Sequence, residues 1–425
     1  MVRSLFHMII PTNNSTEEHT SNIFIICPPG LEKILKNELI EKNLIYKLNP
    51  FEIIQEDVGG IEIKVPSAEW PYYNYILKSA TRILLRVKTF KCRDLPKLFD
   101  RSSKINWKEY LAHHRINIES TSHKSRVFDS RKIESAVLEG IELYFRRNVP
   151  KDKYIQLKEN NSIKDTLFIR FLNDECTISV DTSGELLYKR GLKHTTGKAP
   201  IRENMAYALI YQVTKHLKLN TPDHERHLLD PMCGSGTILW EAAHFHHLNI
   251  KRKFHFEFFP ILQDQLDKIK KTLSAWNEIA TLQPSPFQYL SGADLNLNLI
   301  EHMNQFDHSR ITFQQGDFFN ETHPFLKISS KDQKLMIINP PYGKRVQSNN
   351  PINHEFYRKI ISRAIERFKV EIIGIIIPLD KYKMSQKDLQ ILQVKKLEEW
   401  HFTNGGIPVC FLILQVDLSL KNDPA

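Results

Sequence analysis

The second half of this chain is organised around the stretch Leu228-Leu229-Asp230-Pro231-Met232-Cys233-Gly234-Ser235-Gly236-Thr237. A short apolar run ends at an acidic residue, and two closely spaced glycines follow it. Glycine adopts left-handed backbone conformations and lets a ligand approach the main chain closely. We therefore predict a buried strand, a tight loop and the N-terminus of a helix, with a ligand lying over the loop.

The same strand–loop–helix rhythm continues towards the C-terminus. Short apolar runs alternate with helical segments, which is typical of a parallel sheet with helices on both faces. The strands that we predict are residues 227–231, 287–293, 310–315, 334–339 and 371–378. Two more strands, 398–403 and 408–416, flank Asn404-Gly405-Gly406, which favours a hairpin turn. The expected architecture is α/β, with a mostly parallel sheet of seven strands that ends in an antiparallel pair.

Acidic residues end or follow the first three of these strands. They are Asp230, Asp294 and Asp317. The carboxyl ends of parallel strands meet at one edge of an open α/β sheet, where such sheets bind ligands. We predict that Asp230 orients an amino-acid group, that Asp294 binds two ribose hydroxyls and that Asp317 accepts from an adenine amine. Gly234 and Gly236 would leave room for the ligand.

S-adenosylmethionine fits this pattern better than other nucleotide ligands do. A dinucleotide fingerprint needs a third glycine where Leu239 stands, and an acidic residue about 20 positions later, whereas Asp294 lies much further on. The stretch from Gly191 to Lys198 does not fit a P-loop, because Ala199 follows it where that motif needs Ser or Thr. S-adenosylmethionine has no phosphates, so the glycine loop needs only room for its methionine part. An NAD(P)-dependent oxidoreductase remains a remote alternative.

The segment Asn339-Pro340-Pro341-Tyr342 follows the fourth predicted strand. The prolines lack backbone donors and stiffen the turn, so the Asn339 side-chain oxygen and the Pro340 carbonyl have no competing amide hydrogens. An exocyclic base amine offers two hydrogens to such a pair of acceptors, and Tyr342 offers a ring for stacking. We assign catalytic roles to Asn339, Pro340 and Tyr342, and we place Asn339 beside the cofactor as well.

The first half of the chain is predicted to form two small α+β units. The expected strands are 23–27, 60–65, 83–89, 166–173 and 175–181, and the expected helices are 31–40, 72–82 and 131–145. The net charge of the chain is +10, and the strongest excess lies between Lys78 and Lys108, with ten basic and two acidic residues. A positive surface suits a polyanion, because each phosphate contact releases condensed counterions.

Other features of the sequence exclude several classes of protein. No apolar run reaches the length of a transmembrane helix, and no signal-peptide cleavage pattern is present. The five cysteines are scattered and have no paired spacing, which argues against a disulfide framework and against a zinc site. We expect a cytoplasmic protein that binds neither a membrane nor a metal.

These residues resemble the THUMP-domain branch of the class I RNA methyltransferases, and most of all the enzymes that methylate guanosine N2 in bacterial large-subunit ribosomal RNA. Residues 29–32 and 59–61 are similar to the ferredoxin-like domain of that family, residues 79–84 and 105–107 to its THUMP domain, and residues 230–237 and 339–345 to its catalytic motifs. The mostly polar residues 1–22 are predicted to form a flexible tail. The resemblance implies a ferredoxin-like N-terminal domain at 23–65, a THUMP RNA-binding domain at 66–183, a linker at 184–200 and a class I methyltransferase domain at 201–425.

The resemblance implies an S-adenosylmethionine-dependent enzyme that methylates N2 of a guanosine in RNA, with 23S rRNA favoured. It places Pro200 in the cofactor site, next to a helix that closes over the cofactor. The basic residues expected to contact RNA are Arg82, Arg86, Lys88, Lys91, Arg190, Lys344 and Arg345. A tRNA guanosine-N2 methyltransferase, an adenine-N6 nucleic-acid methyltransferase and a non-catalytic RNA-binding protein remain alternatives. The modified nucleotide and the oligomeric state stay open.

Overall fold

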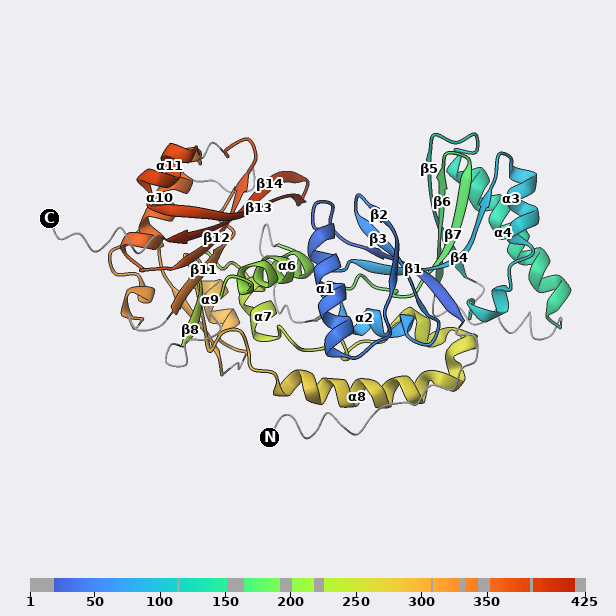
Figure 1. The fold of residues 1–425 in the computed structure, drawn as a ribbon, viewed down its shortest axis with the longest axis horizontal. Helices are drawn as coiled ribbons and strands as arrows, with labels where there is room; N and C mark the ends of the chain where they lie inside the picture. The colour runs from blue at the N-terminus through green and yellow to red at the C-terminus, as the bar shows by residue number, and fades with distance from the viewer. Residues whose placement is uncertain are drawn as a thin grey trace.

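The computed structural model describes residues 19–112, 115–150, 164–191, 201–217, 225–306, 309–328, 333–342, 352–382 and 385–416. Two seven-stranded sheets lie side by side along an elongated molecule (Figure 1). The N-terminal sheet occupies the centre and right of this view, and the C-terminal sheet lies on the left. The α/β architecture predicted from the sequence is confirmed.

The N-terminal sheet has the strand order β2-β3-β1-β4-β7-β6-β5. Its strands are β1 (Thr20–Ile26), β2 (Glu52–Asp57), β3 (Gly60–Pro66), β4 (Arg82–Lys91), β5 (Ile116–His123), β6 (Asp165–Leu172) and β7 (Glu175–Asp181), and its helices are α1 (Glu32–Ile45), α2 (Tyr73–Ile76), α3 (Leu95–Ser102) and α4 (Ser130–Asn148). Strand β1 pairs with β3 on one side and with β4 on the other. The sheet therefore crosses the predicted domain boundary at 65/66 without a break. Strands β2 and β5 were not predicted.

The predicted helix at 72–82 is wrong over most of its length. A 3₁₀ turn (Trp70–Tyr72) leads into the four residues of α2, which ends at Leu77 with an extended backbone, and an irregular segment leads from there to β4. The backbone amides of Lys78 and Ser79 donate to the buried Glu38 carboxylate at 2.8 and 3.0 Å. Because these amides bond a side chain of α1, they are not available to helix carbonyls, and the helix ends.

The C-terminal sheet has the order β10-β9-β8-β11-β12-β14-β13. Its strands are β8 (Arg226–Asp230), β9 (Tyr289–Asp294), β10 (Ile311–Gln315), β11 (Gln333–Ile338), β12 (Ile372–Pro378), β13 (Val394–Asn404) and β14 (Ile407–Val416), and its helices are α6 (Glu203–Thr214), α7 (Thr237–Ala243), α8 (Leu266–Leu282), α9 (Leu297–Met303), α10 (His354–Glu366) and α11 (Gln386–Ile391). The first five strands are parallel, and β14 is antiparallel to both β12 and β13. This arrangement confirms the mostly parallel sheet.

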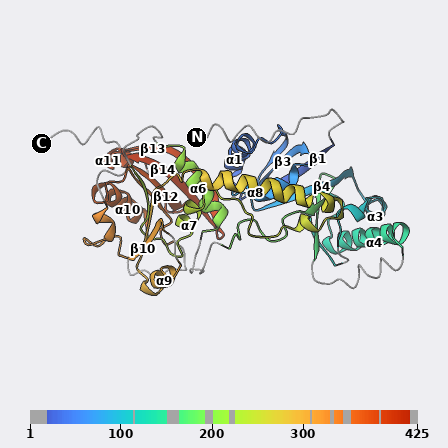
Figure 2. The same ribbon diagram turned by 90° about the horizontal axis from the view of Figure 1, so that it is seen from below.

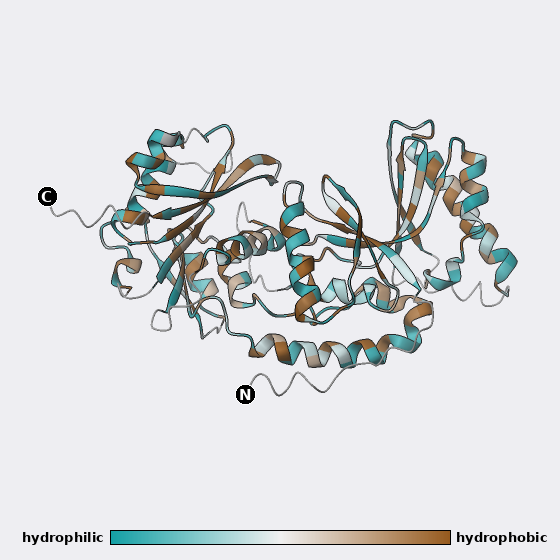
Figure 3. Cartoon of the chain, viewed as in Figure 1, coloured by the Kyte–Doolittle hydropathy of each residue, from teal (hydrophilic) through white to brown (hydrophobic). Residues whose placement is uncertain are grey.

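The inner strands of the C-terminal sheet are apolar on both faces. Every residue of β11 and β12 is buried, as expected for parallel strands that are covered by helices on either side. Figure 3 shows hydrophobic residues along these strands and more hydrophilic outer faces on α10 and α11. The predicted hairpin is confirmed: Asn404 pairs with Ile407, and the turn residues Gly405 and Gly406 have φ of +58° and +85°.

The segment between α7 and β9 joins the two halves of the molecule. Helix α8 runs beneath the N-terminal sheet, and its C-terminal end is directed towards the C-terminal half (Figures 1 and 2). Phe254, Phe256 and Phe259 are fully buried in the core of the N-terminal half, and Trp276 of α8 packs against Tyr46 with 4.7 Å between ring centroids. This segment of the C-terminal half is therefore part of the hydrophobic core of the N-terminal half.

A buried charge network crosses the same junction. Glu241 of α7 lies 3.5 Å from the Lys78 ammonium and 3.2 Å from the Arg190 guanidinium, and all three side chains are almost completely buried. Burial lowers the pKa of Lys78 to about 8, although Glu241 acts in the opposite direction. Charges without water need close partners, so this network fixes the position of α7 relative to the N-terminal half.

All five cysteines are buried and free. Among the described residues, no helix has both the length and the apolar character needed to cross a membrane. Residues 1–18 lie outside the described range, and β1 begins at Thr20, three residues earlier than predicted.

Replacing Glu241 by Gln should destabilise the protein by about 3 to 5 kcal/mol, because two buried cations would lose their carboxylate. Urea unfolding followed by circular dichroism measures this change. Glu185 pairs with Lys189 at an exposed position, so Glu185→Gln is a matched control with an expected effect below about 1 kcal/mol. Equal effects of the two substitutions would contradict the role of the buried network.

Candidate active site

The order of the C-terminal sheet reverses between β8 and β11. These two strands pair in parallel, with Leu229 opposite Met336, while β9 continues on one side and β12 on the other. Loops on the two sides of such a reversal leave a crevice at the carboxyl ends of the strands. Asp230 ends β8 and Asn339 directly follows β11, so the structure brings the two predicted motifs to this position.

Asp230 is the last residue of β8 at this edge of the sheet and is 2% exposed. Among the described residues its Oδ1 atom has no hydrogen-bond partner. Burial and the nearby Asp294 raise the pKa of Asp230 well above its ordinary value, and a hydrogen bond from the Met232 amide offsets part of this shift. A cationic group from a ligand would provide the missing partner and stabilise the ionised carboxylate.

The two glycines of the loop have different surroundings. Both have left-handed backbones, with φ of +53° at Gly234 and +70° at Gly236. A Cβ atom at Gly234 would meet nothing within 4 Å, so this residue borders open space. A Cβ atom at Gly236 would lie 2.8 Å from the Phe313 ring. Gly234 therefore leaves room for a ligand, whereas Gly236 allows the loop to pack against β10.

Asp294 fastens the glycine loop to the end of β9. Its Oδ2 accepts from the Gly234 amide at 2.9 Å, and its Oδ1 accepts from the Asn296 amide at 3.0 Å. A carboxylate has about four acceptor positions, so it can still accept from two ligand hydroxyls. Asp317 is exposed beyond β10, and its Oδ1 accepts from the Phe319 amide at 2.9 Å. Both acidic residues lie at the edge where the sequence placed them.

Asn339 presents an acceptor that the described part of the protein does not use. Its Oδ1 atom is buried and has no hydrogen-bond partner there. Pro340 beside it is buried, and Tyr342 is 9% exposed. The Tyr342 hydroxyl accepts a hydrogen bond from the side chain of Asn404, at the end of β13. The stacking role of the Tyr342 ring remains a prediction.

These features fit S-adenosylmethionine. The unpartnered oxygen of Asp230 suits the ammonium of the methionine part, and the open space at Gly234 gives the ligand access to the loop. Asp294 and Asp317 add acceptors further along the same edge. The sequence also placed Pro200 in this site, but residue 200 lies outside the described residues. Asn204, in the neighbouring α6, donates to Thr81 of the N-terminal half at 3.0 Å.

Three of the predicted RNA contacts are held inside the protein. The side chains of Arg82, Arg86 and Arg190 are 15%, 9% and 3% exposed, and each guanidinium pairs with a carboxylate. Their partners are Asp181, Glu62 and Glu241, in that order. Binding phosphate would require these ion pairs to break, so we leave the three arginines out of the RNA surface that we propose below.

The other predicted RNA contacts divide into two groups. Lys88 and Lys91 are exposed on β4 and make no ion pair among the described residues. Lys344 and Arg345 lie outside the described residues. Arg86 and Lys88 are two positions apart, so the alternation expected for a strand places both on the same face and does not distinguish them. A charge count identifies the basic segment, but the partners of each side chain come from other strands.

Two functional candidates were missed in the sequence. Asn404 was interpreted only as a turn residue, yet its side chain reaches Tyr342. Tyr357 of α10 is 1% exposed, and its hydroxyl has no partner among the described residues. Neither residue belongs to a recognisable motif. Their proximity to the catalytic segment arises from strand order and helix packing, which have no local signal.

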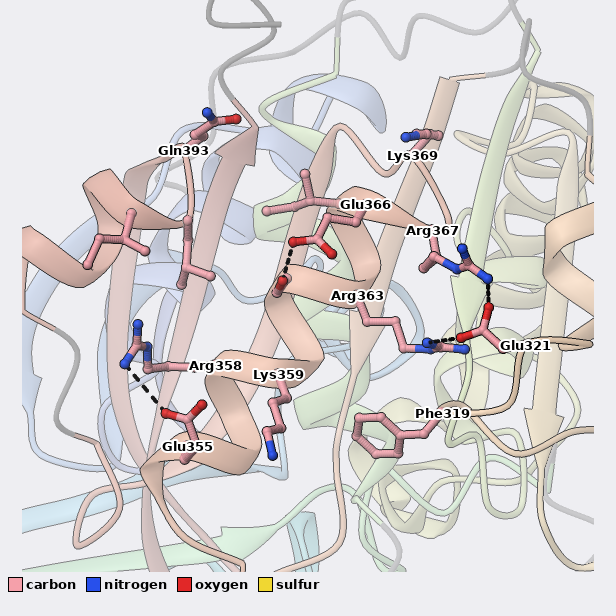
Figure 4. Close-up of a pocket in the computed structure, with 14 residues that line it drawn as sticks. Phe319, Glu321, Glu355, Arg358, Lys359, Arg363, Glu366, Arg367, Lys369 and Gln393 are labelled. Atoms are coloured by element: carbon pink, nitrogen blue, oxygen red, sulfur yellow. Dashed lines mark hydrogen bonds and ion pairs between the residues drawn. The ribbon is translucent and has the colours of Figure 1, made fainter.

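A groove of about 760 Å³ runs along the outer face of α10 (Figure 4). Its arginines pair with acidic residues of the same groove: Arg358 with Glu355, and Arg363 and Arg367 with Glu321. The groove contains none of the predicted catalytic or cofactor residues. Because its three arginines already have carboxylate partners, we assign no ligand to it.

The described residues bring together one group of side chains that could ligate a metal. It consists of Glu399, His401 and Cys410, whose ligand atoms lie within 4.8 Å of one another. The Glu399 carboxylate already accepts from Lys396 at 2.7 Å and from His401 at 2.7 Å. A lysine ammonium at this carboxylate opposes the binding of a cation, and the group carries no role in our proposal.

Alanine at the two loop glycines should separate folding from ligand binding. Both substitutions place a Cβ atom on a left-handed backbone, at a cost of roughly 1 to 2 kcal/mol. Gly236→Ala should unfold at clearly lower urea concentration than Gly234→Ala, because it also collides with Phe313. Gly234→Ala should weaken S-adenosylmethionine binding more strongly at equal folded fraction. Calorimetric titration checks the binding, and the reverse order of effects would contradict these roles.

Comparisons with known proteins show similarity to methyltransferases. A family model described as "RMKL-like, methyltransferase domain" (UPF0020) matches residues 190–407. The ribosomal RNA large subunit methyltransferase K/L of Buchnera aphidicola is 27% identical over 403 residues, which cover 89% of this chain and 52% of that protein. The chain thus spans about half of the length of that relative.

Two further matches cover most or all of the length of the matched protein. The tRNA (guanine(6)-N2)-methyltransferase of Methanocaldococcus jannaschii is 29% identical over 357 residues, which cover 81% of this chain and 86% of that protein. The crystal structure of a possible methylase from Clostridium difficile 630 has a TM-score of 0.69 at 24% identity, with coverage of 96% and 100%. This structural likeness supports the fold, and the family model, which covers half of the sequence, shows that the chain belongs to the RMKL-like methyltransferase domain family, UPF0020.

Proposed function

We propose that this protein transfers a methyl group from S-adenosylmethionine to the exocyclic N2 of a guanosine in RNA. The buried Oδ1 of Asn339 carries the proposal, because it lies at the same edge as Asp230 and accepts from no described residue. Both relatives quoted above are named as RNA methyltransferases, one for ribosomal RNA and one for guanine N2 of tRNA. We favour 23S rRNA as the substrate, with tRNA as the alternative.

Some residues at this edge would bind the methyl donor, and others would bind the guanine base. Asp230, Asp294 and Asp317 would bind S-adenosylmethionine, which supplies an electrophilic methyl group when bound. Asn339 Oδ1 and the Pro340 carbonyl accept the two hydrogens of the guanine amine and orient its nitrogen. Fixed orientation of the reacting atoms lowers the barrier without a strong base.

The chemistry is a direct displacement. The amine nitrogen forms the new N–C bond while the C–S bond of the donor breaks, and the positive sulfur becomes a neutral thioether. One proton then leaves the methylated nitrogen to solvent. Because N2 is engaged in a G·C pair within a duplex, the target must be unpaired or flipped out. The same acceptors would serve adenine N6, so the identity of the methylated nucleoside decides between the two amines.

Asn339→Ala tests the catalytic assignment. It should lower kcat by about 10²-fold or more, as the loss of a positioned hydrogen-bonding group does in other enzymes, and leave S-adenosylmethionine affinity within about threefold. Methyl transfer is measured with rRNA and tRNA from a strain that lacks the protein, and mass spectrometry identifies the methylated nucleoside. Asn353→Ala removes the exposed N-cap of α10 and is the control, with unchanged kcat expected. Near wild-type turnover in Asn339→Ala would refute the assignment.

A positive surface on β4 is proposed to hold the RNA that flanks the target. Lys88 and Lys91 are both exposed on the same strand, three positions apart. At the end of this strand Arg93 and Arg126 share Asp174 and remain 66% and 71% exposed. Exposed cations of this kind bind phosphates without base specificity.

The double variant Lys88→Glu and Lys91→Glu should weaken RNA binding by about tenfold or more and reduce the slope of log K against log salt concentration. Fluorescence anisotropy with a labelled RNA at several salt concentrations measures both quantities. Lys268→Glu and Lys270→Glu on α8 make the same change of charge on another exposed surface and serve as the control. An equal loss in both double variants would show that only the total charge matters.

The protein is also proposed to act in the cytoplasm. Its five cysteines are free and buried, which suits a reducing compartment.

A further inference from the structure

The catalytic tyrosine is held by a residue from the far end of the sheet. Tyr342 is 9% exposed and packs in the same apolar cluster as Ile337 of β11 and Phe402 of β13. Its hydroxyl is the polar end of an otherwise buried ring, and it accepts from Asn404 Nδ2 at 2.5 Å. Asn404 is itself 6% exposed. Water has little access to this bond, so its loss would leave two buried groups unsatisfied.

The position of Asn404 is fixed by the hairpin. Asn404 is the last residue of β13 and pairs with Ile407 across the two-glycine turn. Both turn residues have positive φ, as tight hairpins with the native strand twist require. Strand β13 also packs against the N-terminal half, where a Cβ atom at Gly30 would lie 1.9 Å from the His401 carbonyl oxygen. The hairpin is thus restrained by its own strand pairing and by its contact with the N-terminal half.

The geometry points to Asn404 as a positioning residue for the base-holding segment, an inference that rests on the proposed function. Only two prolines separate Asn339 from Tyr342, so the acceptor and the ring share one stiff segment. A hydrogen bond to the hydroxyl holds the far end of the ring and so limits the swing of the ring about the Cα–Cβ bond. Asn404 acts on the substrate through Tyr342, by holding the ring in place beside the amine bound by Asn339.

A merely structural role for Asn404 predicts a different outcome. In that case its removal would lower stability, and the folded fraction would keep its turnover. If Asn404 acts through the hydroxyl of Tyr342, the loss of either partner should have the same kinetic effect. The loss of both should then add nothing, because the two residues contribute one interaction.

The experiment is a double-mutant cycle of Asn404→Ala and Tyr342→Phe, with methyl transfer measured under conditions where all variants are folded. We expect kcat to fall about fivefold to tenfold in each single variant and by the same factor in the double variant, in line with one hydrogen bond. The affinity for S-adenosylmethionine, measured by calorimetry, should stay within about twofold. Additive losses in the double variant, or unchanged kcat in Asn404→Ala, would overturn the inference.

The chain contains a matched control pair. Tyr73 Oη donates to Asn43 Oδ1 at 2.9 Å, and both residues are buried in the N-terminal half, away from the catalytic segment. Asn43→Ala and Tyr73→Phe remove the same kind of buried bond, so they should lower the urea midpoint and leave kcat unchanged. A similar loss of kcat in this pair would mean that reduced stability alone explains the effect.

The cycle also separates this inference from the proposed function. A wild-type protein that methylates RNA while Asn404→Ala retains full kcat refutes only the role of Asn404. A wild-type protein that methylates neither rRNA nor tRNA refutes the proposed function and the role of Asn404 with it.

Discussion

The reversal of strand order between β8 and β11 is the constraint on which the site depends. Parallel strands direct their carboxyl ends to one edge, and at this reversal the loops leave in opposite directions. The crevice therefore receives Asp230 from one strand and Asn339 from its neighbour. Residues more than one hundred positions apart meet because two apolar strands pair in register.

Two polar tethers keep the loops of this edge in place. Asp294 bonds the glycine loop through the Gly234 amide, and Asn404 bonds the segment after β11 through Tyr342. Each tether comes from a strand other than the one that carries the loop. The loops are thus fixed by the sheet as a whole, while Asp230 and Asn339 keep acceptors that no described residue uses. This combination of fixed backbone and free acceptors is what a ligand site requires.

The N-terminal half is attached through buried surfaces as well as by the chain itself. Aromatic residues of the segment before α8 complete its core, and Glu241 pairs with both Lys78 and Arg190 at the junction. Three arginines predicted to bind RNA turned out to have carboxylate partners inside the protein. Lys88 and Lys91 remain for the proposed surface, since the strand directs them to solvent.

The sequence by itself determined the α/β class, the strand order along the chain and the edge at which the acidic residues and Asn339 gather. Local signals suffice there, because apolar runs, glycines and prolines act on their own neighbourhood. Tertiary structure alone decided that Glu38 ends α2 early, that β1 joins two predicted units in one sheet and that Asn404 reaches Tyr342. Each of these depends on a partner far away in the sequence. Such a contact cannot be predicted from the residues that neighbour either partner in the chain.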